Sequence, residues 1–445
     1  PVIADSGAVQ PAAMSTREVA TPDQSILDLY LQLHQAPELS FKEAKTSSIL
    51  ASELESLGFE VTTGVGQDWV VDKAMRDIGE VKPGVGGYGV VGVLKNGNGP
   101  TVLIRTDMDA LPVPEQTGVP YASTVEAQTW TGVDSPVMHA CGHDVHMTAW
   151  LGTARALVAQ KSKWKGTLVM IAQPAEEIGL GAEAMLADGL FERFPKPDYN
   201  LALHVSADAP SGTVVYSTGY AMANVDSVDI HVKGVGGHGA YPHTTRDPIL
   251  IGAHIVTALQ SLVSRNVNPL DSAVVTVGSF KAGAKHNIIP DECHLQLTIR
   301  SYSPDVRKHL REAIHRKAYA TAESFRAPKP EVEYSEGTPS LFNDERLVQR
   351  IVPVFMEALG DDKVTLADRS MGGEDFSRYG RAGVPIFMFR VGSVSQTRLD
   401  GFATKGQTPP SLHSAKYYPD ADETLETSIR ATVSALMELL PARKQ

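Results

Sequence analysis

The chain has few cysteines, no long apolar run and a deficit of positive charge. Only two cysteines, Cys141 and Cys293, occur among its 445 residues, which argues against a disulfide framework. No stretch of about 18 apolar residues is present, so no transmembrane helix is expected. The formal net charge of −12 argues against nucleic acid or an anionic membrane surface as a partner.

The N-terminal segment gives the only hint of location. It reads PVIADSGAVQPAAMSTREVA, without an initiator Met and without hydrophobic periodicity. We therefore expect residues 1–22 to be flexible. The segment fits either the mature end left by a signal peptidase or an arbitrary boundary, which slightly favours a periplasmic or secreted location over a cytoplasmic one.

Helical and strand-like patterns alternate along most of the chain. A composition of 42% hydrophobic residues over this length predicts two domains with sizeable cores. The main helical patterns cover 25–33, 42–57, 147–160, 345–359 and 423–440. Short apolar strands are predicted at 89–94, 101–105, 167–173, 200–205 and 386–391. This alternation predicts an α/β sheet covered by helices on both faces.

A different order of elements interrupts this pattern between about 226 and 337. The predicted elements are strand 227–233, helix 247–265, strands 273–280 and 293–302, helix 305–325 and strand 331–334. This βαββαβ order is typical of a ferredoxin-like α+β domain. We therefore predict one domain formed by 1–225 and 338–445, with residues 226–337 inserted into it.

The segment MHACGHDVH, Met138 to His146, is the densest group of potential metal ligands. Thiolate and neutral imidazole are preferred zinc ligands, and Cys141 and His143 are spaced to present both on one side of a turning backbone. A histidine cluster that serves only packing is the alternative. The density of donors in nine residues favours the metal site.

Further donors follow downstream. Glu177 and its neighbour Glu176 leave a predicted strand in QPAEE, His204 ends another strand, and His413 lies in a polar loop. Each has an ordinary alternative: the acidic first turn of a helix, a core histidine or a solvated loop histidine. Together with the cluster they provide enough donors for two metal ions that share a ligand.

Two other segments contain candidate residues. Asp109, in RTDMDALP, could accept the second N–H of a ligating imidazole, or could be an ordinary turn or cap residue. His238, in GVGGHGAYPH, is surrounded by glycines, which permit close approach to a ligand but are also common in turns.

Eight motifs in order carry a family resemblance from about Ser25 to the C-terminus. They are RTDMDALP, MHACGHDVH, QPAEE, LHV, GGHGAYPH, NIIP, MGGEDF and LHSAKYYPD. The set resembles the aminoacylase and carboxypeptidase family of dinuclear metallohydrolases, within its hippurate hydrolase and auxin-conjugate amidohydrolase branch. The resemblance implies a zinc-peptidase-like catalytic domain with an inserted ferredoxin-like lid or dimerisation domain.

The resemblance also implies roles for individual residues. Two divalent ions, zinc or manganese, would be held by Cys141, His143, Glu177, His204 and His413, with the cysteine bridging them. Glu176 would be the general base. His238 resembles a lid histidine that reaches an active site, often the partner subunit's, and Asn287 and Arg300 match lid positions associated with substrate binding. A homodimer or higher homo-oligomer through the inserted domain is implied.

The implied reaction is hydrolysis of the amide bond of an N-acyl or N-aroyl amino acid to a carboxylic acid and a free amino acid. A hydroxide held between the two metals would attack the carbonyl after Glu176 had taken the proton of the bound water. A metallo-carboxypeptidase or dipeptidase acting on short peptides is the alternative. In either case the partner is a small molecule.

The chain departs from the wider family at two places. Many relatives have His-x-Asp where this chain has Asp107-x-Asp109, and an aspartate where it has Cys141. The resemblance implies a site rebuilt around Cys141 and His143, so Asp107 is not assumed to be a ligand. About twenty extra residues, including Trp69, separate the GVG repeats at Gly64 and Gly84. This insertion is expected either to line the substrate cleft or to pack against a neighbouring subunit.

Overall fold

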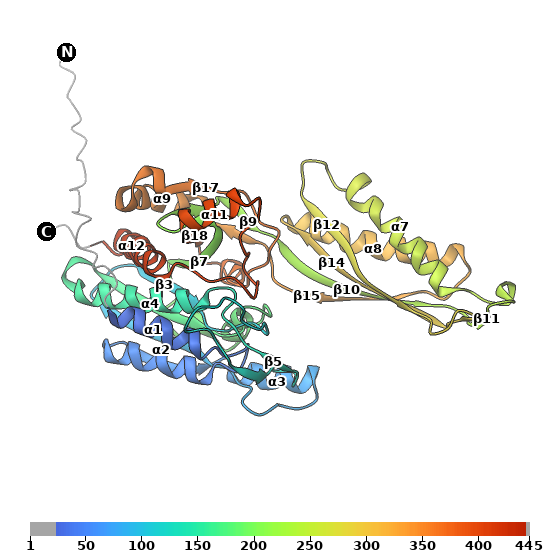
Figure 1. Ribbon diagram of the computed structural model, residues 1–445, viewed down its shortest axis with the longest axis horizontal. Coiled ribbons are helices and arrows are strands. Elements are labelled where there is room, and N and C mark those ends of the chain that lie inside the picture. Colours follow the sequence, from blue (N-terminus) through green and yellow to red (C-terminus); the bar gives the residue numbers. More distant parts are fainter. Residues whose placement is uncertain (1–23, 442–445) are drawn as a thin grey trace, which may run out of the picture.

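The computed structural model describes residues 24–441 of the chain. The expected flexibility of residues 1–22 lies outside the described residues. The described part forms two lobes, a larger one built on a wide sheet and a smaller one that extends away from it (Figure 1).

An eight-stranded sheet is the centre of the larger lobe. Its strands, in spatial order, are β1 (Glu60–Val65), β2 (Gly89–Asn96), β6 (Gly166–Gln173), β3 (Thr101–Asp107), β7 (Tyr199–Pro210), β18 (Ile386–Val394), β8 (Val214–Tyr216) and β17 (Val364–Leu366). The four central strands β6, β3, β7 and β18 are parallel, whereas β1, β2 and β8 are each joined to the sheet by antiparallel pairing. The sheet is therefore mixed, with a parallel centre.

Helices cover both faces of this sheet, which explains the almost continuous apolar strands. In β3, Val102 and Ile104 belong to the core on one face, and Leu103 belongs to the core on the other. Packed on the first face are α1 (Gln24–Gln35), α2 (Ala44–Ser56), α4 (His143–Ala159), α9 (Glu345–Leu359) and α12 (Ala421–Leu439). The second face is covered by α5 (Gly181–Ala187), α6 (Leu190–Arg193) and α10 (Ser377–Arg381). The predicted α/β architecture is thus confirmed.

The smaller lobe, called the lid below, has the predicted βαββαβ order. Its antiparallel sheet contains β12 (Ala273–Ala282), β14 (Glu292–Ser301), β10 (Asn224–Lys233) and β15 (Glu331–Glu336). Two helices, α7 (Pro248–Arg265) and α8 (Pro304–Ser324), lie on one face of it (Figure 1). Alternate residues such as Val228 and Leu295 pack against Ile255 and Leu310 in a separate core. The other face of the sheet, which carries His231 and Gln296, is polar.

Shorter elements complete the fold. They are α3 (Gln67–Asp77), β4 (Glu126–Gln128), β5 (Asp134–Pro136), β9 (Gly219–Met222), β11 (Gly237–His238), β13 (Ile288–Ile289), β16 (Leu341–Asn343) and α11 (Gln396–Thr404). Within residues 24–441, no helix combines the length and apolar character needed to cross a bilayer. Cys141 and Cys293 are both buried and free, the latter in the lid core.

Candidate metal centre

The predicted ligands meet at the carboxyl ends of the central parallel strands. Strand β3 ends at Asp107, β6 ends at Gln173 three residues before Glu176, and β7 carries His204. Ligands collect at this edge of an open α/β sheet because the following loops converge there. The sheet topology therefore brings together segments that are up to a hundred residues apart.

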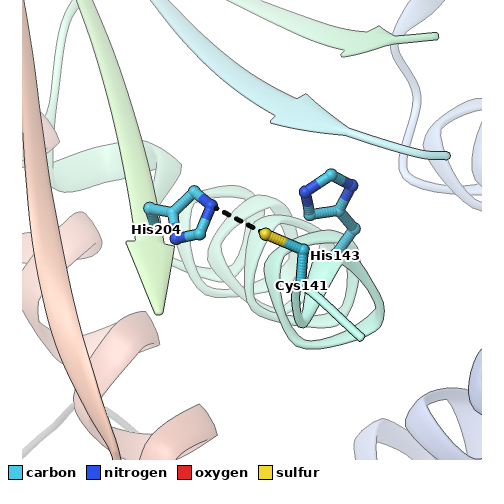
Figure 2. A group of neighbouring side chains, drawn as sticks. All are labelled: Cys141, His143 and His204. Atoms are coloured by element: carbon cyan, nitrogen blue, oxygen red, sulfur yellow. Dashed lines mark hydrogen bonds between the residues drawn. The ribbon is translucent and has the colours of Figure 1, made fainter. Parts of the chain in front are cut away.

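Cys141 and His143 lie at the turn that starts α4. Gly142 has a φ of +77°, and a Cβ at this position would lie 2.6 Å from a side-chain carbon of Val205, so only glycine fits. The turn points the Cys141 thiol towards His204, with Sγ and Nε2 3.5 Å apart (Figure 2). The helix begins at His143 itself, four residues earlier than the sequence predicted.

Glu176 and Glu177 are held by a strained loop and by Asp109. Ala175 has a φ of +52°, a conformation that L-residues rarely adopt. The Asp109 carboxylate accepts hydrogen bonds from the backbone N–H groups of Glu176 (3.0 Å) and Glu177 (3.1 Å). As a result Oε1 of Glu177 lies 3.7 Å from Nε2 of His143.

His413 reaches the same place from a distant loop. Its φ of +67° is again left-handed, and its backbone N–H donates to the carbonyl of Ala140 at 2.8 Å. This bond ties the loop to the segment that carries Cys141. The ring Nε2 lies 3.4 Å from Oε2 of Glu177, and the side chain is 56% exposed.

The donor atoms form two groups that share one sulfur. Ligand atoms lie within 4.8 Å of one another in the group of Cys141, His143 and His204 and in the group of Cys141, Glu177 and His413. The rings are oriented by their other nitrogens, since Nδ1 of His143 donates to the Asp109 carbonyl (2.7 Å) and Nδ1 of His204 donates to the Val205 carbonyl (2.8 Å). Each Nε2 therefore faces the other donors, where it could bind a metal.

Two buried atoms of these groups lack hydrogen-bond partners among the described residues: Nε2 of His143 and Oε1 of Glu177. Buried polar atoms are normally satisfied, so this pair points to a missing partner between them. Since imidazole nitrogen, carboxylate oxygen and cysteine sulfur all bind zinc-like ions, the residues fit a pair of divalent metal ions.

The electrostatics of the site also favour bound cations. Burial raises the pKa of Glu177 to about 8, with Asp109 and Asp107 adding to the effect and His143 opposing it. Burial, together with Glu177 and Glu176, raises the pKa of the Cys141 thiol well above its usual value. A divalent cation would stabilise the thiolate and the carboxylate in this buried setting.

Glu176 lines the same cavity as the donor groups, but it differs from Glu177 in its surroundings. Its Oε2 is 4.0 Å from Nε2 of His143, and its side chain is 10% exposed. Burial and the neighbouring Glu374 raise the pKa of Glu176 well above its usual value, against the opposing effect of Arg105. A carboxylate with a raised pKa, exposed to the cavity, is suited to accept and return a proton.

Sequence reasoning missed the buried network behind Glu176. The fully buried Arg105 donates to Asp107 (2.6 Å), Glu374 (2.9 Å) and Asp375 (3.2 Å). The motifs RTDMDALP and MGGEDF contain all of these residues, but only the fold shows that the two motifs meet. Arg105 thereby provides positive charge next to the acidic side of the site.

His146 and Asp109, from MHACGHDVH and RTDMDALP, support the site through hydrogen bonds. His146 donates from Nδ1 to Asp107 (2.7 Å) and accepts at Nε2 from the backbone N–H of Val205 (2.9 Å), so both ring nitrogens are used. The backbone carbonyl of Asp109 accepts from Nδ1 of His143, and its carboxylate accepts from the backbone N–H groups of Glu176 and Glu177 and from Ser40 Oγ (2.6 Å).

A cavity of about 470 Å³ contains the site, and we call it the catalytic cavity. Its lining includes Cys141, Glu176, Glu177, His204 and His413, and the lid contributes Arg300. Among the described residues, neither His238 nor Asn287 lines it.

His238 and Asn287 instead lie together at the tip of the lid, which is distant from the eight-stranded sheet (Figure 1). His238 is exposed, and the carbonyl of Asn287 accepts from the N–H of Gly239 at 2.9 Å. Any role of these two residues in catalysis therefore requires lid movement or a second subunit, and their assignment stays a prediction.

No residue of the insertion around 67–86 is among those that line the catalytic cavity, and packing against a neighbouring subunit stays a prediction. The insertion forms α3, whose Val70 packs with Phe41, Ala175 and Ala184 in a small core. Trp69 lies against this core, with its ring 6.4 Å from that of Phe41. The insertion thus supports the Glu176 loop from behind, within the same chain.

Comparison with known proteins identifies the family of the chain. The model of peptidase family M20/M25/M40 matches residues 103–405. The chain is 38% identical over 358 residues to the putative amidohydrolase YhaA of Bacillus subtilis, covering 80% of this chain and 82% of the relative. It is 36% identical over 403 residues to the N-acetyldiaminopimelate deacetylase of Halalkalibacterium halodurans, covering 90% and 95%.

A solved structure shows the same fold. The YXEP protein of Bacillus subtilis, described as a dinuclear metal-binding peptidase from the M20 family, superposes with a TM-score of 0.71 at 28% identity over 93% of this chain and 97% of its own. The expected zinc-peptidase-like fold with its inserted lid is therefore confirmed. The chain belongs to peptidase family M20/M25/M40 and is a hydrolase acting on amide bonds.

Proposed function

We propose that the protein is a metal-dependent amidohydrolase that cleaves N-acyl or N-aroyl amino acids to a carboxylic acid and a free amino acid. The observation that carries the proposal is the pair of donor groups sharing Cys141, with Glu176 beside them in the catalytic cavity. The deacetylase and amidohydrolase relatives support this reaction class.

Two divalent ions, zinc or manganese, would be held by Cys141, His143, Glu177, His204 and His413. When bound, they would polarise the amide carbonyl and lower the pKa of water from 15.7 towards about 7. Glu176 has the position of the general base: it would take the proton of the attacking water and return it to the leaving amine.

Arg300 is the candidate for recognising the product amino acid. It is half-buried and lines the catalytic cavity from the lid, and a guanidinium binds carboxylates through paired hydrogen bonds. His238 and Asn287 would join the site on lid closure or from a partner subunit, with His238 stabilising the oxyanion and Asn287 assisting substrate binding. Assembly through the lid into a homodimer or larger homo-oligomer is part of this proposal.

Turnover of a substrate panel tests the proposal. The purified protein, reconstituted with zinc or with manganese, is given N-acetyl, N-benzoyl, indole-acetyl and aminoacyl derivatives of one amino acid. Release of the amino acid that a chelator abolishes and metal restores is expected for the acyl and aroyl derivatives, as in the hippurate hydrolase and auxin-conjugate branch. Cleavage of the aminoacyl derivatives alone would assign a dipeptidase or carboxypeptidase instead.

A further inference from the structure

A second cavity adjoins the catalytic cavity on the far side of His204. Its volume is about 330 Å³, and it shares the wall residues His204, Met222 and Leu412 with the catalytic cavity. We call it the side cavity. Its other lining residues are Val205, Ser206, Ala207, Asp208, Ser370, Met388, Arg390, Thr408, Pro409, Pro410 and Ser411.

The wall of the side cavity is rich in apolar side chains. Met222 and Leu412 form the boundary with the catalytic cavity, Met388 lies at 5% exposure, and Pro409 and Pro410 come from the loop before His413. Methionine is flexible and polarisable, so it adapts to apolar groups of different shape. Such a wall suits a hydrocarbon or an aromatic ring.

Polar groups in the side cavity are partly engaged with the protein itself. Ser206 donates to the carboxylate of Asp208, and Arg390 contacts the carbonyl of Asp368 at 3.5 Å. Although seven of the fourteen lining residues are polar, most of the surface that they expose to the cavity together with their neighbours is apolar, as in most small-molecule sites.

The position of the side cavity separates the two ends of a substrate. All of its lining residues come from the larger lobe, whereas Arg300 lines the catalytic cavity from the lid strand β14. An amide bond held beside Cys141 and Glu176 can therefore direct its carboxylate towards Arg300 and its acyl group past His204.

We propose that the side cavity binds the acyl group and makes the enzyme selective for bulky apolar acyl groups, aromatic or of medium chain length, over acetyl. This inference rests on the proposed amidohydrolase function. A methyl group is about as large as a water molecule, which occupies about 30 Å³ in the liquid, so the methyl of an acetyl group would leave most of the cavity unfilled. A benzoyl ring or an octanoyl chain would fill much more of it and bury apolar surface.

Relative kcat/KM values for one amino acid carrying N-acetyl, N-benzoyl or N-octanoyl groups test the inference with the metal-loaded enzyme. Each methylene that is buried raises kcat/KM by up to about fourfold. A preference of at least about tenfold in kcat/KM for the two bulky groups over acetyl is therefore expected. Met222→Trp, which narrows the shared wall, should reduce the bulky-to-acetyl ratio by at least about tenfold.

Two further variants keep the test decisive. Thr408→Trp places the same ring in the side cavity from an exposed loop position, so it should also reduce the bulky-to-acetyl ratio. It replaces Met222→Trp in the test if that variant fails to fold. Met75→Trp is the matched control, because Met75 is 51% exposed on α3 and does not line the cavity. It should leave the ratio unchanged.

Binding of the product acids separates the failure of this inference from the failure of the proposed function. In calorimetric titrations of the metal-loaded protein, benzoate and octanoate should bind more tightly than acetate, and the two cavity variants should remove the difference. Acetyl substrates cleaved as fast as bulky ones, or equal binding of the three acids, would overturn the acyl-site assignment. Absence of cleavage of every N-acyl amino acid, with the binding preference intact, would instead overturn the proposed function alone.

Discussion

The carboxylate of Asp109 holds the backbone of Glu176, since its Oδ1 accepts the Glu176 N–H at 3.0 Å. Through Oδ2 it also accepts from the N–H of Glu177 and the hydroxyl of Ser40. Its own backbone carbonyl orients His143. One residue therefore positions the proposed base and two of the proposed ligands.

Asp109→Asn should lower both metal affinity and kcat by about 10- to 100-fold, because an amide nitrogen cannot accept the backbone hydrogen bonds. Metal titration and steady-state kinetics measure these effects. Asp271→Asn, on an exposed lid loop, is the matched control. Unchanged metal affinity and kcat in Asp109→Asn would show that the backbone of the Glu176–Glu177 loop is held by other contacts.

Cys141→Ser should lose at least one of the two metal equivalents, because a serine hydroxyl is a poorer ligand than a thiolate. Elemental analysis after dialysis gives the stoichiometry. Cys293→Ser is the natural comparison, since it changes the only other cysteine, located in the lid core, and should keep both metals. Two tightly bound metals in Cys141→Ser would contradict a bridging thiolate.

Arg300→Ala should raise KM for an N-acyl amino acid by about 10- to 100-fold, with a smaller change in kcat, if the guanidinium binds the substrate carboxylate. The corresponding substrate amide, which lacks that carboxylate, should be affected much less. Arg300→Lys should recover part of the loss. An equal effect on acid and amide substrates would assign Arg300 to a structural role.

His34, in the last turn of α1, should make the stability of the protein dependent on pH. Burial lowers the pKa of His34, but hydrogen bonds to Asp144 (2.6 Å) and Glu115 (3.2 Å) outweigh burial and raise this pKa to about 9. The folded pKa lies above the unfolded value of 6.5, so this stabilisation is complete below about pH 6.5. It is lost as the pH rises through about 9.

The charged His34 contributes at most about 3 kcal/mol to the free energy of unfolding, since its pKa rises from 6.5 to about 9 and each pKa unit corresponds to about 1.36 kcal/mol. Urea unfolding between pH 6 and 10 measures it, and His34→Gln should flatten the profile in that range. A wild-type free energy of unfolding that stays constant from pH 6.5 to 9.5 would count against a charged His34.

Much of the fold was predictable because apolar periodicity follows directly from burial. Strand β3 is apolar on both faces because helices cover both, and β10 alternates because only one face of the lid sheet is covered. The βαββαβ order of the lid followed from the same patterns. The antiparallel pairing of the outer strands could not be predicted from the sequence, because pairing direction depends on contacts between distant segments.

The candidate ligands were predictable because their residue types are chemically distinctive. What the sequence did not reveal depends on three-dimensional contact: the meeting of Arg105 with Glu374, the support of Ala175 by α3, and the distance of His238 from the catalytic cavity. No local pattern encodes these relationships. The same holds for the contacts of the Asp109 carboxylate, since its partners Glu176 and Glu177 are 67 and 68 residues away.

The activity of Glu176→Gln at measured metal content tests most directly whether the site is a dinuclear hydrolase centre with Glu176 as its base. This variant should bind two metals, and its kcat for an N-acyl amino acid should be reduced by about 10²- to 10⁴-fold, because glutamine cannot carry the proton. Glu55→Gln, an exposed change of the same kind, should remain fully active. Near wild-type turnover by metal-loaded Glu176→Gln would contradict the assignment of Glu176 as the general base.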